Sequence, residues 1–217
     1  MPSNALGKFE GAMMKDVNRI IATHASIQNG GRGNKALGHL TRSGVLLLCA
    51  AWELYVEELM IEAVRECSQR AQSPSDLPKS VQKSIAEHVK GSQHQLRVLA
   101  LAGDGWRAVY AEMAVEWVSS LNTPNKHNIN EGFKKLIGIE GLASNWSFGD
   151  NSVNDFVKAR GDVAHKGSAA GNIHMNKLRE TYLPQIMRCA VDTDNAVSTY
   201  IRSIFEPKAY PWNRRGV

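Results

Sequence analysis

Apolar residues recur at helical spacing along most of the chain, and no stretch of useful length alternates as a half-buried strand does. The first predicted helix covers residues 4–28. It ends at the glycine-rich linker 29–38, which has neither the Gly-Lys-Ser/Thr ending nor the preceding strand of a phosphate-binding loop. The second predicted helix, 39–71, is apolar around most of its circumference in its first half, which is typical of the central helix of a bundle. Its main apolar stripe consists of Leu48, Trp52, Tyr55, Leu59 and Ala63.

The middle of the chain predicts shorter helices joined by turn-rich connectors. Helical spacing covers residues 78–90 and 104–121, whereas residues 93–101 fit either a helix or a loop. A further short helix is expected within residues 121–142. Either Asn128 or Asn130 is its predicted N-cap, and Gly138 its predicted C-cap.

Two more helices complete the predicted chain. One starts near Ser152, and the last runs from after Asn172 to about Phe205, with a kink or a break expected at Pro184. These patterns predict an all-α protein, an antiparallel helical bundle in which residues 1–205 form one domain. The tail, residues 206–217, interleaves aromatic and basic side chains as single-stranded nucleic acid binders do, but a disordered, frayed terminus is the favoured interpretation.

Charge and cysteine content limit the classes of function. The 217 residues carry a net charge of +5, which is compatible with an anionic partner such as nucleic acid and equally with an ordinary basic cytosolic protein. The three cysteines form no CxxC pair, so we expect free thiols in a reducing compartment. No secretory signal or membrane-spanning run is recognisable, which predicts a cytoplasmic protein without membrane contact.

Candidate chemistry concentrates in VKARGDVAHKG, residues 157–167, where Arg160 and His165 stand five positions apart. In one continuous helix they would lie roughly 140° apart and would not share a face. A cooperating pair therefore requires the helix to end between them or a second copy of the chain to supply one member. Gly161 weakens a helix and Gly167 favours a C-cap, so we expect the helix to loosen near His165.

An Arg–His pair suits the cleavage of RNA through its own 2′-hydroxyl group. Histidine moves protons near neutral pH, and arginine stabilises the charge that grows on the phosphorus-bound oxygens. The competing interpretation is a basic helix end, because the helix dipole also favours Arg and His there. The other histidines are scattered and form no metal-binding motif, so neither a metal nor a cofactor is expected.

Several segments of the chain resemble the HEPN superfamily, in its RiboL-PSP-HEPN branch. RGDVAHKG is similar to the superfamily's Arg–His signature. The segments 43–63, 121–139 and 146–171 resemble its long second helix, its middle element and its motif helix. The resemblance covers most of residues 5–205 and implies an all-helical bundle that dimerises with its two motifs facing each other.

The resemblance also implies a function: metal-independent endoribonuclease activity, often in toxin–antitoxin or phage-defence systems. Arg160 would then hold the scissile phosphate and His165 would act as the general base or acid. Glu53 and Asp162 would support them, although Gly161 replaces the polar residue that often follows the motif Arg. Lys158 and Lys166 are candidate RNA contacts. The expected partners are RNA, a second copy of the chain, and an antitoxin or other protein. The alternative is a non-catalytic module that binds RNA, nucleotide or a protein.

Overall fold

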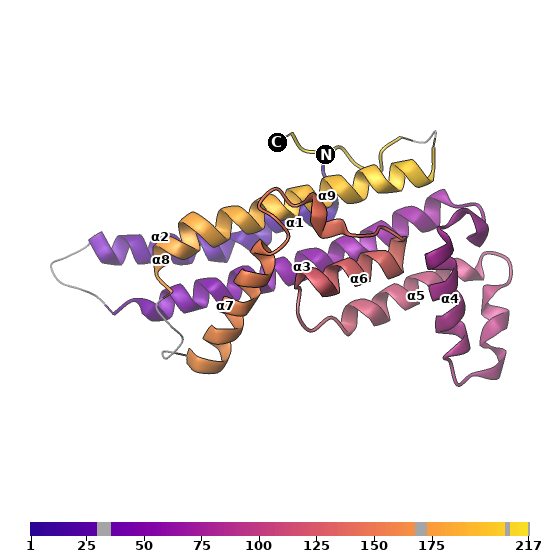
Figure 1. Ribbon diagram of the computed structural model, residues 1–217, viewed down its shortest axis with the longest axis horizontal. Coiled ribbons are helices and arrows are strands. Elements are labelled where there is room, and N and C mark those ends of the chain that lie inside the picture. The colour runs from indigo at the N-terminus through magenta and orange to yellow at the C-terminus, as the bar shows by residue number, and fades with distance from the viewer. Residues whose placement is uncertain (30–35, 168–172, 207–208, 217) are drawn as a thin grey trace.

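A 33-residue helix, α3 (Gly38–Arg70), forms the axis of the computed structural model, which describes residues 1–29, 36–167, 173–206 and 209–216. The helices α2 and α9 run along one side of α3, and α5 and α6 along another (Figure 1). The described residues form helices and no strand, so the predicted all-α class is confirmed. In chain order the other elements are α1 (Asn4–Lys8), η1 (Phe9–Met13), α2 (Met14–Asn29), η2 (Pro74–Asp76), α4 (Lys79–Lys90), η3 (Gln95–Leu101), α5 (Gly105–Ser119), α6 (Lys126–Ile137), η4 (Leu142–Asn145), α7 (Ser152–Lys166), α8 (Met175–Lys177), η6 (Leu178–Tyr182) and α9 (Leu183–Ile204).

The predicted central helix is confirmed as α3, which packs against α1, α2, α5, α6, α7 and α9. Two large aromatic residues in its middle are buried and carry polar groups that need partners. Trp52 Nε1 donates to the carbonyl of Pro124 at 3.0 Å, and the Tyr55 hydroxyl donates to the carbonyl of Ala190 at 2.7 Å. These two bonds fix α3 to the segment before α6 and to α9.

The predicted N-terminal helix is confirmed, with one wide turn inside it. Its first turn is capped by Ser3, whose Oγ accepts from the backbone N–H of Leu6 at 3.0 Å. The π-helical turn η1 then separates α1 from α2 and keeps Phe9 buried against Tyr55, with the ring centroids 5.1 Å apart. Of the predicted linker that follows, residues 30–35 lie outside the described residues.

The predicted N-cap of α6 is wrong, by three residues for Asn128 and by five for Asn130. Its N-cap is Asn125, whose side chain accepts from the backbone N–H of Asn128 at 2.9 Å. Neither Asn128 nor Asn130 caps the helix: the Asn128 amide donates to the carbonyl of Thr123 at 2.8 Å, and Asn130 Oδ1 accepts from the backbone N–H of Ala143 at 2.9 Å. The predicted C-cap is confirmed, since Gly138 has φ +88 in the left-handed region.

The last helical stretch carries its irregularity just before Pro184. The π-helical turn η6 lies between α8 and α9, and Pro184 occupies the first turn of α9, a position where proline is tolerated. Leu178 of η6 packs closely on α3, because a Cβ atom added to Gly44 would lie 2.5 Å from its Cδ2 atom. The predicted start of this stretch, after Asn172, lies at the edge of the undescribed residues 168–172.

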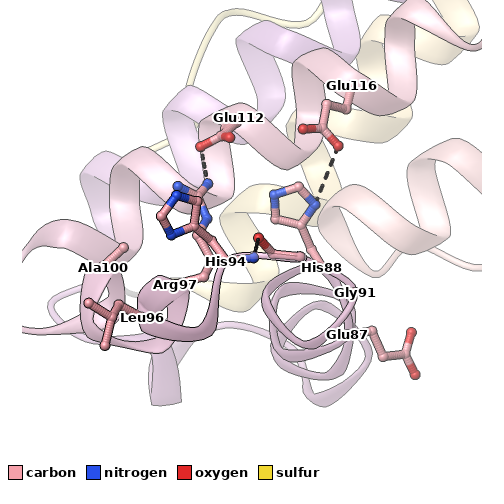
Figure 2. Close-up of a pocket in the computed structure, with 10 residues that line it drawn as sticks. Glu87, His88, Gly91, His94, Leu96, Arg97, Ala100, Glu112 and Glu116 are labelled. Atoms are coloured by element: carbon pink, nitrogen blue, oxygen red, sulfur yellow. Dashed lines mark hydrogen bonds and ion pairs between the residues drawn. The ribbon is translucent and has the colours of Figure 1, made fainter.

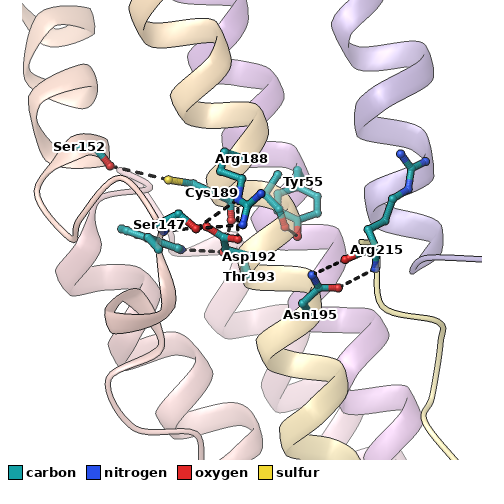
Figure 3. Close-up of polar contacts among 11 residues, drawn as sticks. Tyr55, Ser147, Ser152, Arg188, Cys189, Asp192, Thr193, Asn195 and Arg215 are labelled. Carbon is teal, nitrogen blue, oxygen red and sulfur yellow. Dashed lines mark hydrogen bonds and ion pairs between the residues drawn. The ribbon is translucent and has the colours of Figure 1, made fainter. Parts of the chain in front are cut away.

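Residues 209–216 of the C-terminal tail lie against α9 and the N-terminal helices (Figure 1). Trp212 is only 7% exposed, and its carbonyl accepts from the Ser198 hydroxyl at 2.9 Å. Arg215 exchanges two hydrogen bonds with Asn195 (Figure 3) and forms an ion pair of 2.7 Å with Glu10. The tail therefore ties the first and last helices together.

Candidate functional site

The Arg–His motif lies on α7, a helix that leaves the bundle obliquely (Figure 1). Val153, Phe156 and Val163 are its buried residues, and the helix packs against α3 and α9. The first turn is fixed by Ser152, whose hydroxyl donates to the carbonyl of Gly149 at 2.9 Å and lies 3.7 Å from the Cys189 sulfur (Figure 3). The N-terminal half of α7 is thus held firmly, Val163 still packs on the core, and only the exposed residues after it project from the bundle.

Arg160 is half-buried on the side of α7 that faces α3. Burial raises the pKa of the Glu53 carboxyl above its ordinary value, and the positive charge of Arg160 partly offsets this rise. Burial likewise raises the pKa of the Cys49 thiol to about 11, again with Arg160 acting in the opposite direction. Arg160 therefore lies within electrostatic reach of Glu53, although no direct ion pair joins them among the described side chains.

The expectation that the helix loosens near His165 is wrong. α7 stays helical through Gly161 to Lys166 and ends at Gly167, the predicted C-cap, with φ +53. A glycine inside a helix costs only about 1 kcal/mol relative to alanine, and the buried Val163 holds the last turn on the bundle. In this single chain the two motif side chains consequently point about 140° apart.

The other residues predicted on α7 lie together on its exposed side, away from Arg160. Lys158, His165 and Lys166 are exposed, and their positive charges favour the ionised form of Asp162. A 2.7 Å ion pair between Lys166 and Asp162 is the main cause of the lowered pKa of Asp162. The structure thus forms two groups: Arg160 with Glu53 at the α3–α7 junction, and the remaining four residues on the outer face of α7.

An exposed apolar stripe on α3, which the sequence pattern did not distinguish from the core, borders the Arg160–Glu53 junction. Leu46 and Leu47 are each 38% exposed and Leu54 is 44% exposed, at intervals that place them with Ala50 on one helix face. Glu53 lies at the edge of this stripe. When a helix is apolar on nearly all sides, its sequence does not indicate which face remains uncovered. The stripe was therefore identified only from the fold.

A second polar cluster lies at the other end of the bundle, on α4 and α5, and was also missed (Figure 2). It consists of His88, Glu112 and Glu116, whose ligand atoms all lie within 4.8 Å of one another. Glu112 and Glu116 are spaced i, i+4 in the sequence, but nothing in a linear pattern connects them to a histidine 24 residues earlier. This cluster is the set of described residues suited to hold a metal ion.

The fold and the motif helix together define a HEPN-type helical bundle. The sequence model of the RiboL-PSP-HEPN family matches residues 14–198, and the chain belongs to this family. Comparisons with curated proteins and with solved structures give no significant match. None of the helices in the described part of the chain is long and apolar enough to cross a lipid bilayer.

Proposed function

We propose that the protein is a metal-independent endoribonuclease that acts as a homodimer, with Arg160 and His165 as its catalytic residues. Family membership supports a role in RNA or nucleotide chemistry. The observation that carries the more specific proposal is the position of Arg160, half-buried beside Glu53 at the edge of an exposed apolar stripe. A half-buried guanidinium suits a phosphate group, because its planar donors match the phosphate oxygens.

The proposed reaction needs a proton carrier and a fixed positive charge. His165 removes the proton from the 2′-hydroxyl, or protonates the departing 5′-oxygen, and Arg160 binds the non-bridging oxygens of the scissile phosphate. The reaction forms the bond from the 2′-oxygen to phosphorus, breaks the bond to the 5′-oxygen, and leaves a 2′,3′-cyclic phosphate. Lys158 and Lys166 on the outer face of α7 contact neighbouring phosphates.

The angle between the two motif residues explains why a second copy is required. Because they point about 140° apart along one continuous helix, one phosphate group cannot easily contact both side chains of the same α7. A two-fold dimer that covers the stripe of Leu46, Leu47 and Leu54 brings a second α7 to this edge of the molecule. Arg160 of one chain then meets His165 of the other across a shared groove.

The alternative function is a HEPN-type module that binds RNA, nucleotide or a protein without cleaving RNA. Gly161 favours it, because this position supplies no polar side chain beside Arg160. The ion pair between Asp162 and Lys166 favours it too, since it keeps both charged groups engaged with each other. Under this alternative the same groove binds its ligand, and RNA remains intact.

The central experiment incubates the untagged protein with an unstructured RNA oligonucleotide in EDTA and identifies the product ends. We expect cyclic phosphate ends from the wild type and a loss of about 10²- to 10⁴-fold for His165→Ala. His127→Ala is the matched control, because His127 is an exposed histidine on α6. Intact RNA with measurable binding would establish the alternative, and equal cleavage by wild type and His165→Ala would refute the proposed site.

Subunit mixing tests whether the site is shared between two chains. Arg160→Gln and His165→Ala should each be inactive alone. Random re-association after mixing gives about half heterodimers, each with one intact composite site, so about a quarter of wild-type activity should return. No recovery would show that the two residues do not act across subunits.

The oligomeric state tests the proposed dimer face separately. Leu47→Glu places a charge in the α3 stripe and should convert the dimer to a monomer, measured by light scattering after size-exclusion chromatography. Val98→Glu is the control, since Val98 is a 60% exposed apolar residue on η3, outside the stripe. A wild type that is monomeric at micromolar concentration would contradict the proposed face.

A further inference from the structure

The cluster of His88, Glu112 and Glu116 lines an open pocket of about 810 Å³ that is bordered by α4, η3 and α5 (Figure 2). His88 belongs to the last turn of α4, and the two glutamates occupy successive turns of α5. His88 Nδ1 lies 3.6 Å from Glu116 Oε2. Three potential ligands from two packed helices therefore converge on one point.

One of the three side chains is mostly buried and two are largely exposed, as expected for a partly preformed binding site. The His88 side chain is 15% exposed, so its ring is held by the packing of α4 on α5. Glu112 and Glu116 are 48% and 64% exposed, so their carboxylates, which now contact Arg97 and His88, have room to change rotamer. With the imidazole fixed and the two carboxylates able to move, the ligand atoms can adjust to the coordination geometry of a bound ion.

We propose that His88, Glu112 and Glu116 bind one divalent transition-metal ion, with Zn²⁺ as the best fit. One imidazole nitrogen and two carboxylate oxygens are a ligand set that Zn²⁺, Mn²⁺ and Co²⁺ accept and that Mg²⁺ and Ca²⁺ seldom use. Ligand distances of about 2.0–2.1 Å in a tetrahedron place ligand atoms roughly 3.3–3.5 Å apart. The 3.6 Å separation of His88 and Glu116 already approaches this value, and the ligand atom of Glu112 lies within 4.8 Å of both.

Arg97 of η3 supplies a positive charge that competes with an ion for Glu112. Its guanidinium forms an ion pair with Glu112 inside the pocket (Figure 2). Ion and guanidinium compete for the same carboxylate, so metal binding releases Arg97 and with it the main polar tie between η3 and α5. Replacing Arg97 by a neutral residue removes this competitor and strengthens metal binding.

This metal site is independent of the proposed ribonuclease site. α4 and α5 lie at the opposite end of the molecule from the projecting end of α7 (Figure 1). The ion links α4 to α5, so its effect is on the stability of that end of the bundle. Its test therefore uses binding and stability, and RNA cleavage in EDTA stays a test of α7 alone.

The experiment titrates Co²⁺ and Zn²⁺ into the full-length, untagged, EDTA-treated protein. Co²⁺ binding is followed by its visible absorption, and Zn²⁺ binding by isothermal titration and by the shift in Tm. We expect one ion per chain with an apparent Kd below about 10 μM. His88→Ala and Glu116→Gln should each weaken binding at least about 10- to 100-fold, and Arg97→Gln should strengthen it.

His127→Ala serves again as the control, because it removes an exposed histidine from a different helix and should bind the ions as the wild type does. Circular dichroism of each variant establishes that the helices are intact. Binding that needs millimolar metal, or binding that persists unchanged in His88→Ala, would overturn the proposal and leave His88 and Glu116 as an ordinary ion pair.

Discussion

Asp194 on α9 is an unusual acid, because it is fully buried and none of the described donors makes a well-formed hydrogen bond to either of its carboxylate oxygens. Burial raises the pKa of this carboxyl from its ordinary value of 3.8 to about 6. Nearby donors from Ser3 and Trp212 counteract the effect only in part, and the negative charge of Glu62 adds to it. The folded protein therefore holds the proton of Asp194 more tightly than the unfolded chain does.

The size and sign of the effect follow from this difference. Two pKa units correspond to about 3 kcal/mol. Between about pH 4 and pH 6 the folded state keeps a proton that the unfolded state has released, so the free energy of unfolding falls as the pH rises through this window. Above about pH 7 the full penalty of about 3 kcal/mol applies, and below about pH 4 it disappears.

Asp194→Asn removes this titration and should make the variant progressively more stable than the wild type as the pH rises. The measurement is urea unfolding followed by circular dichroism at several pH values from 4 to 7.5. The difference in unfolding free energy, variant minus wild type, should rise by about 3 kcal/mol across the range. Any constant contribution from the new amide cancels in this comparison.

The matched control is Asp16→Asn, because the Asp16 side chain on α2 is 65% exposed. Its difference from the wild type should stay within about 0.5 kcal/mol at every pH. A difference between Asp194→Asn and wild type that does not change with pH would refute the reasoning, because it would mean that the buried carboxyl titrates alike in the folded and unfolded chains.

Three further outcomes are expected. Gly132→Ala should lower the free energy of unfolding by about 1–3 kcal/mol in urea titrations, because the new Cβ atom would lie 2.4 Å from Met60 Cε and 2.8 Å from Trp117 Nε1; an unchanged midpoint would contradict this close packing. Gly161→Ala should raise the free energy of unfolding by about 0.5–1 kcal/mol, since nothing lies within 4 Å of the added atom and alanine favours the helix. A lower free energy of unfolding would contradict the continuous α7. Ellman's reagent should find the three buried thiols unreactive at pH 8 until the protein is unfolded, because burial raises the pKa of each to about 11 or 12; rapid reaction of the native protein would oppose their burial.

Much of the fold was predictable because its strongest patterns are local. The apolar residues around most of the circumference in the first half of residues 39–71 predicted the central helix, and Gly138 predicted the end of α6. The N-cap of α6 was not predictable in the same way, since Asn125, Asn128 and Asn130 are all suitable capping residues. The hydrogen bonds that their side chains make in the folded chain select among them.

The candidate sites show where a linear pattern stops being informative. Arg160 and His165 were found because they lie in one short segment, but their angular separation depends on whether Gly161 breaks the helix. Whether a glycine breaks a helix depends on how the next turn packs against the rest of the protein. Helix propensity, which is a local property, carries no information about that packing. The cluster around His88 depends on how α4 packs across α5, and no spacing within the sequence encodes that crossing.

The contact between the C-terminal tail and α9 links two opposing contributions to the stability of the fold. Trp212 shields Asp194 from water while its own indole adds apolar burial. Removal of the residues after 208 by an exopeptidase would thus lose the favourable burial of Trp212. It would also expose the Asp194 carboxyl to water, which favours its ionised form. Acidic conditions would make such trimming most damaging, because a neutral carboxyl gains nothing from the returning water.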